Sequence, residues 1–212
     1  MVRKTGDKLV LTEGQPAWEI AYLFPNQGEW SEDEYLDLTR DTNHFVELVD
    51  GNIEVLTMPT MTHQLIVGFL SRLLSDFVSS RDLGVVVFGP LRIRLRARNI
   101  REPDIVFMSK ENSDRAADEL WQGADLVIEV VSKDDKSRRR NLKEKRKAYA
   151  EAGIPEYWIV DPQEQRITVL TLSVKGYSVH GEWTGPQFAT SALLKGFKVQ
   201  VDKVFAAARK SA

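Results

Sequence analysis

Residues 125–131 have the sequence Asp-Leu-Val-Ile-Glu-Val-Val, a nearly continuous apolar run rich in β-branched side chains. Such a run is typical of a central strand that is covered on both faces. A second apolar run, Tyr157-Trp158-Ile159-Val160, follows a basic helical segment at about 138–152, which ends at Gly153 before Pro155. Two buried strands joined through a helix predict a sheet with helices packed against it.

The rest of the chain carries both helix and strand signals. Residues 62–79 place apolar side chains at spacings of three to four, which predicts an amphipathic helix. Ser31–Glu34 has the capping-box spacing of a shorter helix. Strand patterns occur at 45–49, 53–56, 85–88, 91–97, 104–108, 167–172 and 177–179, and the first two flank the turn Asp50-Gly51-Asn52, which predicts a hairpin. Because the two types do not alternate strictly, we expect an α+β or mixed α/β fold, with an N-terminal arm at 1–30 and a single domain at 31–212.

The composition excludes several classes of protein. Of the 212 residues, 42% are hydrophobic and 28% are charged, which excludes wholesale disorder and a collagen-like chain. There is no cysteine, which excludes disulfides, thiolate nucleophiles and cysteine-held zinc or iron–sulfur centres. The net charge of -2 excludes a uniformly basic nucleic-acid-coating protein. No apolar stretch approaches the roughly 18 residues of a membrane span, so we expect a soluble, cytoplasmic protein.

Glu129 is an anomaly inside the first apolar run. Alternation along a strand places Val127, Glu129 and Val131 on one face. If both faces of the strand are covered, Glu129 is a buried carboxylate that needs a metal ion or a cation beside it, because an unpaired buried charge is strongly destabilising. The alternative is an edge strand whose Glu129 points to water.

Lys145 is a second anomaly, on the basic helix. A helical projection from Leu142 places Lys145 and Tyr149 on the apolar side, whereas Lys143 and Lys147 fall on the opposite side. A lysine that points inward needs an anionic partner. The alternative is that its stem is buried while its ammonium group reaches water.

Two more carboxylates accompany apolar strands. Asp104 opens a strand directly after Pro103, and Glu47 lies between apolar neighbours in the first strand. Each has an ordinary alternative, since Asp is common at strand starts and a strand face can be solvated. Together with Glu129 and Lys145, however, they supply three carboxylates and one inward lysine. Carboxylate oxygens are the ligands that hard cations such as Mg²⁺ prefer.

Other catalytic motifs are absent from the sequence. The three histidines, His44, His63 and His180, have no zinc-binding spacing. No glycine-rich loop has the spacing that cradles phosphates, and there is no GxSxG. These absences argue against P-loop nucleotide binding, Rossmann cofactors and α/β-hydrolase chemistry.

Basic residues gather in two places. Residues 133–147 contain nine Lys or Arg and three acidic residues, a net charge of +6 in a chain whose total is -2. Arginines also alternate along one predicted strand, at 92, 94, 96 and 98. Positive charge beside a carboxylate site suits a phosphodiester polyanion, and the candidate contacts are Arg92, Arg94, Arg138, Arg139 and His63. The alternative is a solvated helix face and a strand edge protected against aggregation.

These residues resemble a known group of nucleases. Pro103-Asp104 and Glu129-Val130-Val131 are similar to the PD-(D/E)XK signature, with Val131 at the usual lysine position. The segment Lys145–Asp161, above all Ala150–Asp161, resembles the Uma-two family of restriction endonucleases, in which the lysine has moved to the following helix. Glu47-Leu48-Val49-Asp50-Gly51 also matches the family pattern. The resemblance covers roughly residues 20–205.

The resemblance implies a restriction-endonuclease-like core, a mixed β-sheet flanked by helices, and a metal-dependent endonuclease that hydrolyses nucleic acid, DNA above all. It implies that Mg²⁺, or Mn²⁺ in its place, binds Asp104, Glu129 and the Val130 carbonyl, with Glu47 completing the cluster. On this hypothesis Lys145 orients the attacking water, Tyr149 lies one helical turn beyond with its hydroxyl toward the site, and His63 contacts the substrate. A homodimer is expected from the need to address two strands.

Two other functions remain open from the sequence. The chain could be a non-catalytic nucleic-acid-binding module that keeps the fold and the basic surface. It could also be a dimeric interaction protein, in which the Tyr157-Trp158 strand is buried against a second copy.

Overall fold

The computed structural model describes residues 27–40, 45–132 and 138–208. These residues divide into two compact units. The first combines the described part of Met1–Met58 with Arg96–Arg101, and the second combines Pro59–Leu95 with the described part of Glu102–Ala212.

The second unit is built on a six-stranded sheet in the order β11-β10-β9-β8-β6-β3. The apolar run forms the central strand β8 (Leu126–Val130), which pairs in parallel with β9 (Glu156–Asp161) and antiparallel with β6 (Ile105–Ser109). All five residues of β8 and all six of β9 are buried, as the continuous apolar pattern predicts. The outer strands are β3 (Gly84–Phe88), β10 (Arg166–Ser173) and β11 (Gly176–Thr184).

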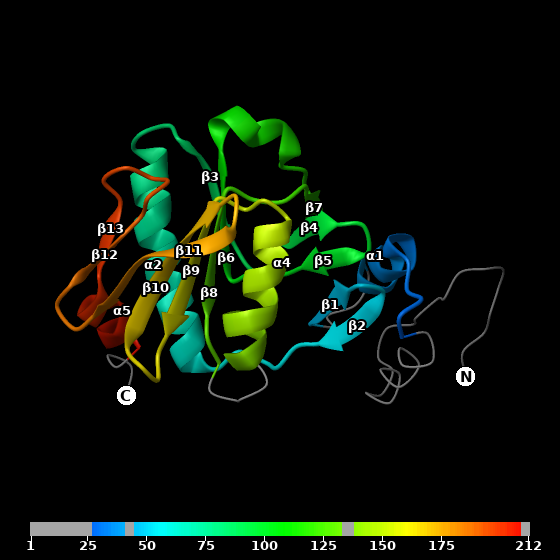
Figure 1. The fold of residues 1–212 in the computed structure, drawn as a ribbon, viewed down its shortest axis with the longest axis horizontal. Helices are drawn as coiled ribbons and strands as arrows, with labels where there is room; N and C mark the ends of the chain where they lie inside the picture. The colour runs from blue at the N-terminus through cyan, green and yellow to red at the C-terminus, as the bar shows by residue number, and fades with distance from the viewer. Residues whose placement is uncertain (1–26, 41–44, 133–137, 209–212) are drawn as a thin grey trace. The chain divides into compact units, whose positions relative to one another are not determined.

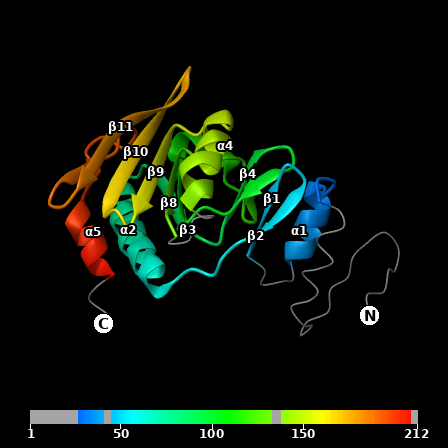
Figure 2. The same ribbon diagram turned by 60° about the horizontal axis from the view of Figure 1, so that its bottom comes forward.

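Helices cover both faces of this sheet (Figures 1 and 2). On one face, α2 (Met61–Ser79) and α5 (Val201–Ala207) enclose a core with Ile128, Val130 and Trp158. On the other face, α4 (Arg146–Glu151) packs its Tyr149 among Val127, Val131 and Tyr157. The alternation predicted for β8 is therefore confirmed, and Glu129 shares the α4 face with Val127 and Val131.

The basic helix begins with a wide turn rather than a regular helix. Residues Arg140–Lys145 form the π-helical turn η3, and α4 continues from Arg146. Just beyond the end of α4, the N–H group of Ile154 donates to the Tyr149 carbonyl at 3.0 Å. Gly153 ends the helix with a φ of 77°, a left-handed conformation that glycine adopts without steric cost. The predicted helix is thus confirmed in extent, with a widened first half.

The first unit contains α1 (Glu32–Arg40) and the strands β1 (Val46–Val49), β2 (Asn52–Val55) and β5 (Asn99–Arg101), with β1 paired antiparallel to both other strands. The predicted hairpin turn has φ values of 51° at Asp50 and 77° at Gly51, as a two-residue type I′ turn requires. The predicted capping box is present too: the Glu34 carboxylate accepts from the Ser31 N–H at 2.9 Å, and the Ser31 hydroxyl accepts from the Glu34 N–H at 3.2 Å.

The sequence patterns missed several short elements. These are the strands β5, β7 (Leu120–Trp121), β12 (Phe188–Thr190) and β13 (Lys198–Gln200), and the 3₁₀ helix η2 (Lys110–Arg115) together with α5. Each strand has only two or three residues, too few to show a period.

The arginine strand β4 (Arg92–Arg96) pairs in parallel with β7 and ends before Arg98, whose φ of 59° places it in a turn. Arg98 therefore does not continue the predicted alternation.

The mixed α/β class is confirmed by these sheets and helices. The predicted arm at 1–30 lies outside the described residues except at its last four positions, and the single domain at 31–212 stays a prediction. Among the described residues, no helix is both long enough and apolar enough to cross a membrane.

Candidate functional site

Glu129 and Lys145 form a buried ion pair. The Lys145 Nζ lies 2.7 Å from Glu129 Oε1, and the two side chains are only 3% and 4% exposed. The Tyr149 hydroxyl donates to the same oxygen at 2.6 Å. The strand β8 presents the carboxylate, and the helix one layer above it presents both donors, one helical turn apart. The structure therefore brings together three residues that the sequence singled out separately.

Asp104 lies beside this ion pair. In the antiparallel pairing of β6 with β8, Ile105 lies opposite Ile128. Asp104, one residue before Ile105, therefore lies opposite Glu129. The Asp104 Oδ2 accepts from the Val130 N–H at 2.7 Å, which joins it to the residue directly after Glu129. Asp104, whose position at the start of a strand has an ordinary alternative in the sequence, thus lies next to the buried Glu129.

His63 completes the group from the first turn of α2. Its Nε2 lies 3.1 Å from Asp104 Oδ2. Burial lowers the pKa of His63, but the hydrogen bond to Asp104 and the negative charges of Asp104 and Glu129 outweigh that effect, so the pKa is raised. The backbone of Val130 also raises the pKa of His63. The buried Nδ1 has no hydrogen-bond partner among the described residues.

The oxygen atoms gathered here suit a hard cation that keeps part of its water shell. Among the residues that the structure describes, no group of three or more His, Asp or Glu side chains is placed to hold a metal ion. Asp104, Glu129 and the Val130 carbonyl supply two carboxylates and one backbone oxygen. Mg²⁺ is commonly held by one or two carboxylates and several waters. The donor set therefore fits a hard cation of this kind.

Glu47 belongs to the first unit. It is fully buried on β1, and its Oε2 accepts from Arg101 Nη1 at 2.9 Å. The same Arg101 nitrogen lies 3.4 Å from Glu54, across the hairpin from Glu47. The sequence alternative of a solvated Glu47 is wrong, because the side chain is buried against a buried guanidinium group. Its predicted part in a metal cluster stays a prediction.

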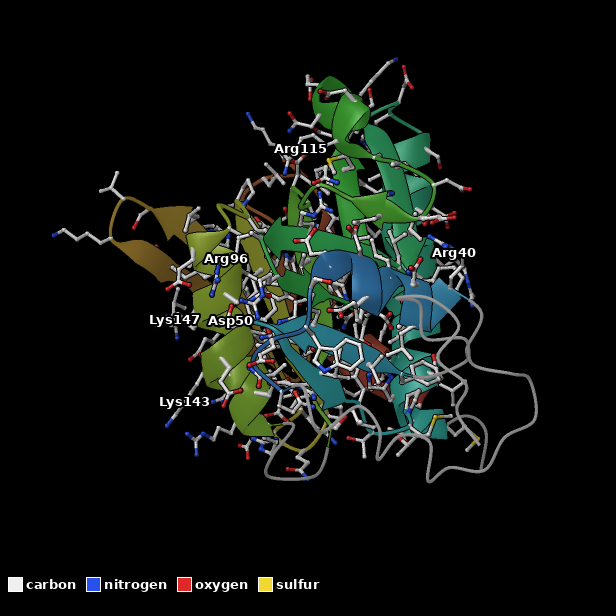
Figure 3. All side chains as sticks on the ribbon, turned by 90° about the vertical axis from the view of Figure 1, so that its right-hand side faces the viewer. Arg40, Asp50, Arg96, Arg115, Lys143 and Lys147 are labelled. Atoms are coloured by element: carbon white, nitrogen blue, oxygen red, sulfur yellow. The ribbon has the colours of Figure 1, made fainter. Side chains whose placement is uncertain are left out.

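Two of the candidate nucleic-acid contacts lie on β4. The Arg92 Nε is 3.7 Å from Glu102, and the Arg94 Nη1 donates to the Gln122 side chain at 3.2 Å. Further along the same strand, Arg96 pairs with Asp50 at 2.7 Å within the first unit, and both residues are labelled in Figure 3.

The other two candidate arginines, Arg138 and Arg139, lie at the start of the basic helix and differ in their exposure. Arg138 makes a bidentate pair with Asp161 at 3.0 and 2.8 Å, so one arginine expected at the surface is instead 81% buried against the end of β9. Burial raises the pKa of Asp161, but the Arg138 hydrogen bond and charge reverse this effect and lower it. Arg139 is 75% exposed and lies 3.5 Å from Glu144.

Exposed lysines lie on the outer side of this helix. Lys143 and Lys147 project outward, away from the buried side that carries Lys145 and Tyr149 (Figure 3). The predicted placement of Lys145 and Tyr149 on the buried side and of Lys143 and Lys147 on the outer side is confirmed, whereas Leu142, from which the apolar side was projected, is 36% exposed. Residues 133–137, which carry part of the predicted basic segment, lie outside the described residues.

Two buried acids received no role from the sequence. Asp161 directly follows the apolar run at 157–160, and Glu156 directly precedes it. Glu156 is fully buried and accepts from four donors: Trp158 Nε1, Ser191 Oγ, and the N–H groups of Ala192 and Leu193, at 2.6–2.8 Å. Three of these donors, on Ser191, Ala192 and Leu193, lie 35 or more residues downstream of Glu156. No local sequence pattern could therefore reveal them.

Comparison with known proteins supports the fold. One similar solved structure is the crystal structure of a "putative nuclease belonging to DUF820" from Anabaena variabilis ATCC 29413. Its TM-score is 0.70 at 18% sequence identity, and the match covers 84% of this chain and 98% of that chain. At this identity the likeness concerns the fold, which confirms the predicted nuclease-like core. No curated protein matches the chain at a significant level.

The sequence also matches a protein family described as "Putative restriction endonuclease" over residues 32–202. The matched range contains the ion pair, Asp104 and His63, and it covers most of the chain. The chain belongs to the Uma2 family of putative restriction endonucleases.

Proposed function

We propose that this protein is a metal-dependent endonuclease that hydrolyses phosphodiester bonds, with DNA as its substrate. The observation that carries the proposal is the buried Lys145–Glu129 ion pair next to Asp104. A carboxylate pair with an adjacent ammonium group is what hydrolysis of a phosphodiester requires: ligands for a cation, and a positive charge for the developing oxyanion. Membership of the Uma2 family supports the same reaction class.

Asp104, Glu129 and the Val130 carbonyl are the proposed ligands of Mg²⁺, with Mn²⁺ as a substitute. The bound ion would lower the pKa of a coordinated water and offset the charge of the scissile phosphate. Asp104 is already oriented by the Val130 N–H and by His63, and Glu129 by Lys145 and Tyr149. Carboxylates held in this way lose little side-chain entropy when they take up a ligand.

Lys145 is the proposed catalytic cation. Its ammonium group is a buried positive charge beside Glu129, so we assign to it the orientation of the attacking water and the stabilisation of the negative charge that develops on a phosphate oxygen. Tyr149 acts as a positioning residue because its hydroxyl donates to the same Glu129 oxygen. His63 is a proposed substrate contact, supported by its buried Nδ1, which has no partner among the described residues.

Arg92, Arg94, Arg138 and Arg139 are the proposed contacts to the nucleic-acid backbone. Arg139 is the best supported, because it is 75% exposed on the helix that carries Lys145. Arg138 is less available, since its guanidinium group is engaged by Asp161. We further propose that the protein works in the cytoplasm as a homodimer, which sedimentation velocity with and without duplex DNA would test.

The proposal is tested with supercoiled plasmid and the purified full chain, in Mg²⁺, in Mn²⁺ and in excess chelator. We expect cleavage only with a divalent ion, and a loss of about 100-fold or more in rate for Asp104→Asn, Glu129→Gln and Lys145→Met. Lys203→Met is the matched control, because Lys203 is an exposed helical lysine on α5, on the other side of the sheet. Circular dichroism checks that each variant is folded.

Absence of metal-dependent cleavage of any DNA or RNA would refute the enzymatic proposal. Salt-sensitive binding of nucleic acid that survives Asp104→Asn would then identify a non-catalytic binding module. Self-association with no affinity for nucleic acid would identify an interaction protein instead.

A further inference from the structure

One oxygen of Glu129 carries two strong donors. Both the Lys145 ammonium group, at 2.7 Å, and the Tyr149 hydroxyl, at 2.6 Å, donate to Oε1. The side chains of Lys145 and Glu129 are almost wholly excluded from water, at 3% and 4% exposure. Water therefore screens their attraction very little, and the ammonium group acts as a full counter-ion to this carboxylate.

The same carboxylate is a proposed metal ligand, and this creates a competition. Asp104 lies opposite Glu129, so the two acids offer two negative charges to a cation, and Lys145 already neutralises one of them. A positive charge within hydrogen-bonding distance of a carboxylate repels a second cation that approaches the same oxygen atoms, and burial strengthens this repulsion. The ammonium group of Lys145 should therefore lower the affinity of these oxygen atoms for a divalent cation.

We infer that Lys145 is an internal counter-ion that occupies Glu129 in the metal-free protein and weakens the binding of divalent cations. The inference rests on the proposed function, because it concerns the same metal site. Filling the site with a divalent cation loosens the bond between Lys145 and Glu129, and the ammonium group can then donate to a substrate oxygen. Lys145 is thereby kept away from nucleic acid until the metal is bound.

A purely structural role for Lys145 makes a different prediction. If the lysine only compensates a buried charge, its removal destabilises the fold, because a buried carboxylate is left without its cation. If Glu129 does not also take up the metal, this loss of stability leaves the affinity for a divalent cation unchanged. The affinity for a divalent cation, measured without nucleic acid, separates the two roles.

The experiment is titration calorimetry of the purified full chain with Mn²⁺. We expect Lys145→Met to bind Mn²⁺ about ten-fold or more tightly than the wild type, because one positive charge has left the site. Tyr149→Phe removes a neutral donor from the same oxygen and leaves the charge in place, so its affinity should be no higher than that of the wild type. Lys203→Met, on α5, should match the wild type.

A second variant and a second readout protect the test against misfolding. Lys145→Gln keeps an N–H donor for Glu129 but carries no charge, and it should also bind Mn²⁺ more tightly. Thermal melting should show a larger rise on addition of Mn²⁺ for both Lys145 variants than for the wild type.

The outcomes distinguish this inference from the proposed function. If the wild type binds Mn²⁺ and neither Lys145 variant binds it more tightly, the counter-ion role is wrong while the metal site stands. If no protein binds Mn²⁺, both the inference and the proposed metal dependence are wrong. If the Lys145 variants bind Mn²⁺ more tightly but the wild type cleaves no nucleic acid, the counter-ion role stands and the nuclease proposal falls.

Discussion

Glu129 and Glu156 show how one residue type serves two purposes in neighbouring strands. Both carboxylates are buried, at 3% and 0% exposure. Glu156 accepts from a tryptophan, a hydroxyl and two backbone N–H groups, so neutral donors satisfy its charge and tie the segment after β12 to β9. Glu129 is instead compensated by an ammonium group and lies beside a second acid. Burial alone therefore does not mark a reactive acid, whereas the kind of partner does.

Asp125 provides a pH-dependent test at the level of a single residue. Burial raises its pKa, but hydrogen bonds from Ser109 and Asn112 and the charge of Arg115 outweigh burial, so the pKa is lowered. A lowered pKa in the folded state contributes stability above the unfolded-state value of about 3.9, and this contribution is lost as the pH falls through the folded-state pKa.

We therefore expect Asp125→Asn to lower the free energy of unfolding by about 1–3 kcal/mol near neutral pH. The difference from the wild type should shrink as the pH falls from about 5 to about 3. Urea unfolding at several pH values measures it. Asp118→Asn, at an exposed position of the same connection, should show no such convergence, and a constant difference for Asp125→Asn would contradict the assignment.

At the scale of elements, α2 links a helix cap to the site. Thr60 precedes the helix in an extended conformation, and its hydroxyl accepts from the His63 N–H at 3.2 Å. The bond defines the first turn, from which the His63 ring reaches Asp104. The cap therefore supports both the longest helix of the described chain and the placement of a proposed substrate contact.

Thr60→Ala should lower the free energy of unfolding by about 0.5–2 kcal/mol, because one N-terminal N–H group of the helix loses its acceptor. Thr60→Ser keeps the hydroxyl and should stay within about 0.5 kcal/mol of the wild type. Chemical denaturation followed by circular dichroism measures both. Equal losses in the two variants would show that the Thr60 methyl group, and not its hydroxyl, stabilises the helix start.

At the scale of the whole molecule, charge is distributed unevenly although the total is only -2. The outer side of the helix after β8 carries exposed Arg139, Lys143 and Lys147, while Lys145 on the same helix is buried. If this surface contacts the phosphate backbone, each contact releases counter-ions and adds to the salt dependence of binding.

Arg139→Ala should therefore weaken binding to duplexes of any sequence by a similar factor. It should also reduce the slope of log affinity against log salt concentration by about one. Fluorescence anisotropy with labelled duplexes at several salt concentrations provides the slope, with Lys203→Ala as control. An unchanged slope would place the nucleic acid on another surface.

Local chemistry was enough to predict much of this protein. The apolar run at 126–130, the spacing along 62–79 and the turn at Asp50-Gly51 predicted a central strand, a helix and a hairpin, because each signal arises within a few neighbouring residues. The mismatch of Glu129 and Lys145 with their apolar surroundings indicated, for the same reason, that each needs a partner of opposite charge if it is buried. Elements of two or three residues, such as β5 and β7, were missed because they are too short to show a period.

The partners of each charged group depended on contacts between distant parts of the chain. Glu129 meets a lysine 16 residues away, Asp104 an N–H group 26 residues away, and Arg101 an acid 54 residues away. A pattern of neighbours reveals that a charge is out of place, but a buried charge is stabilised by whatever the folded sheet and helices bring next to it. For that reason the sequence identified Glu129 and Lys145 as anomalies, and the packing of α4 on β8 made them a pair.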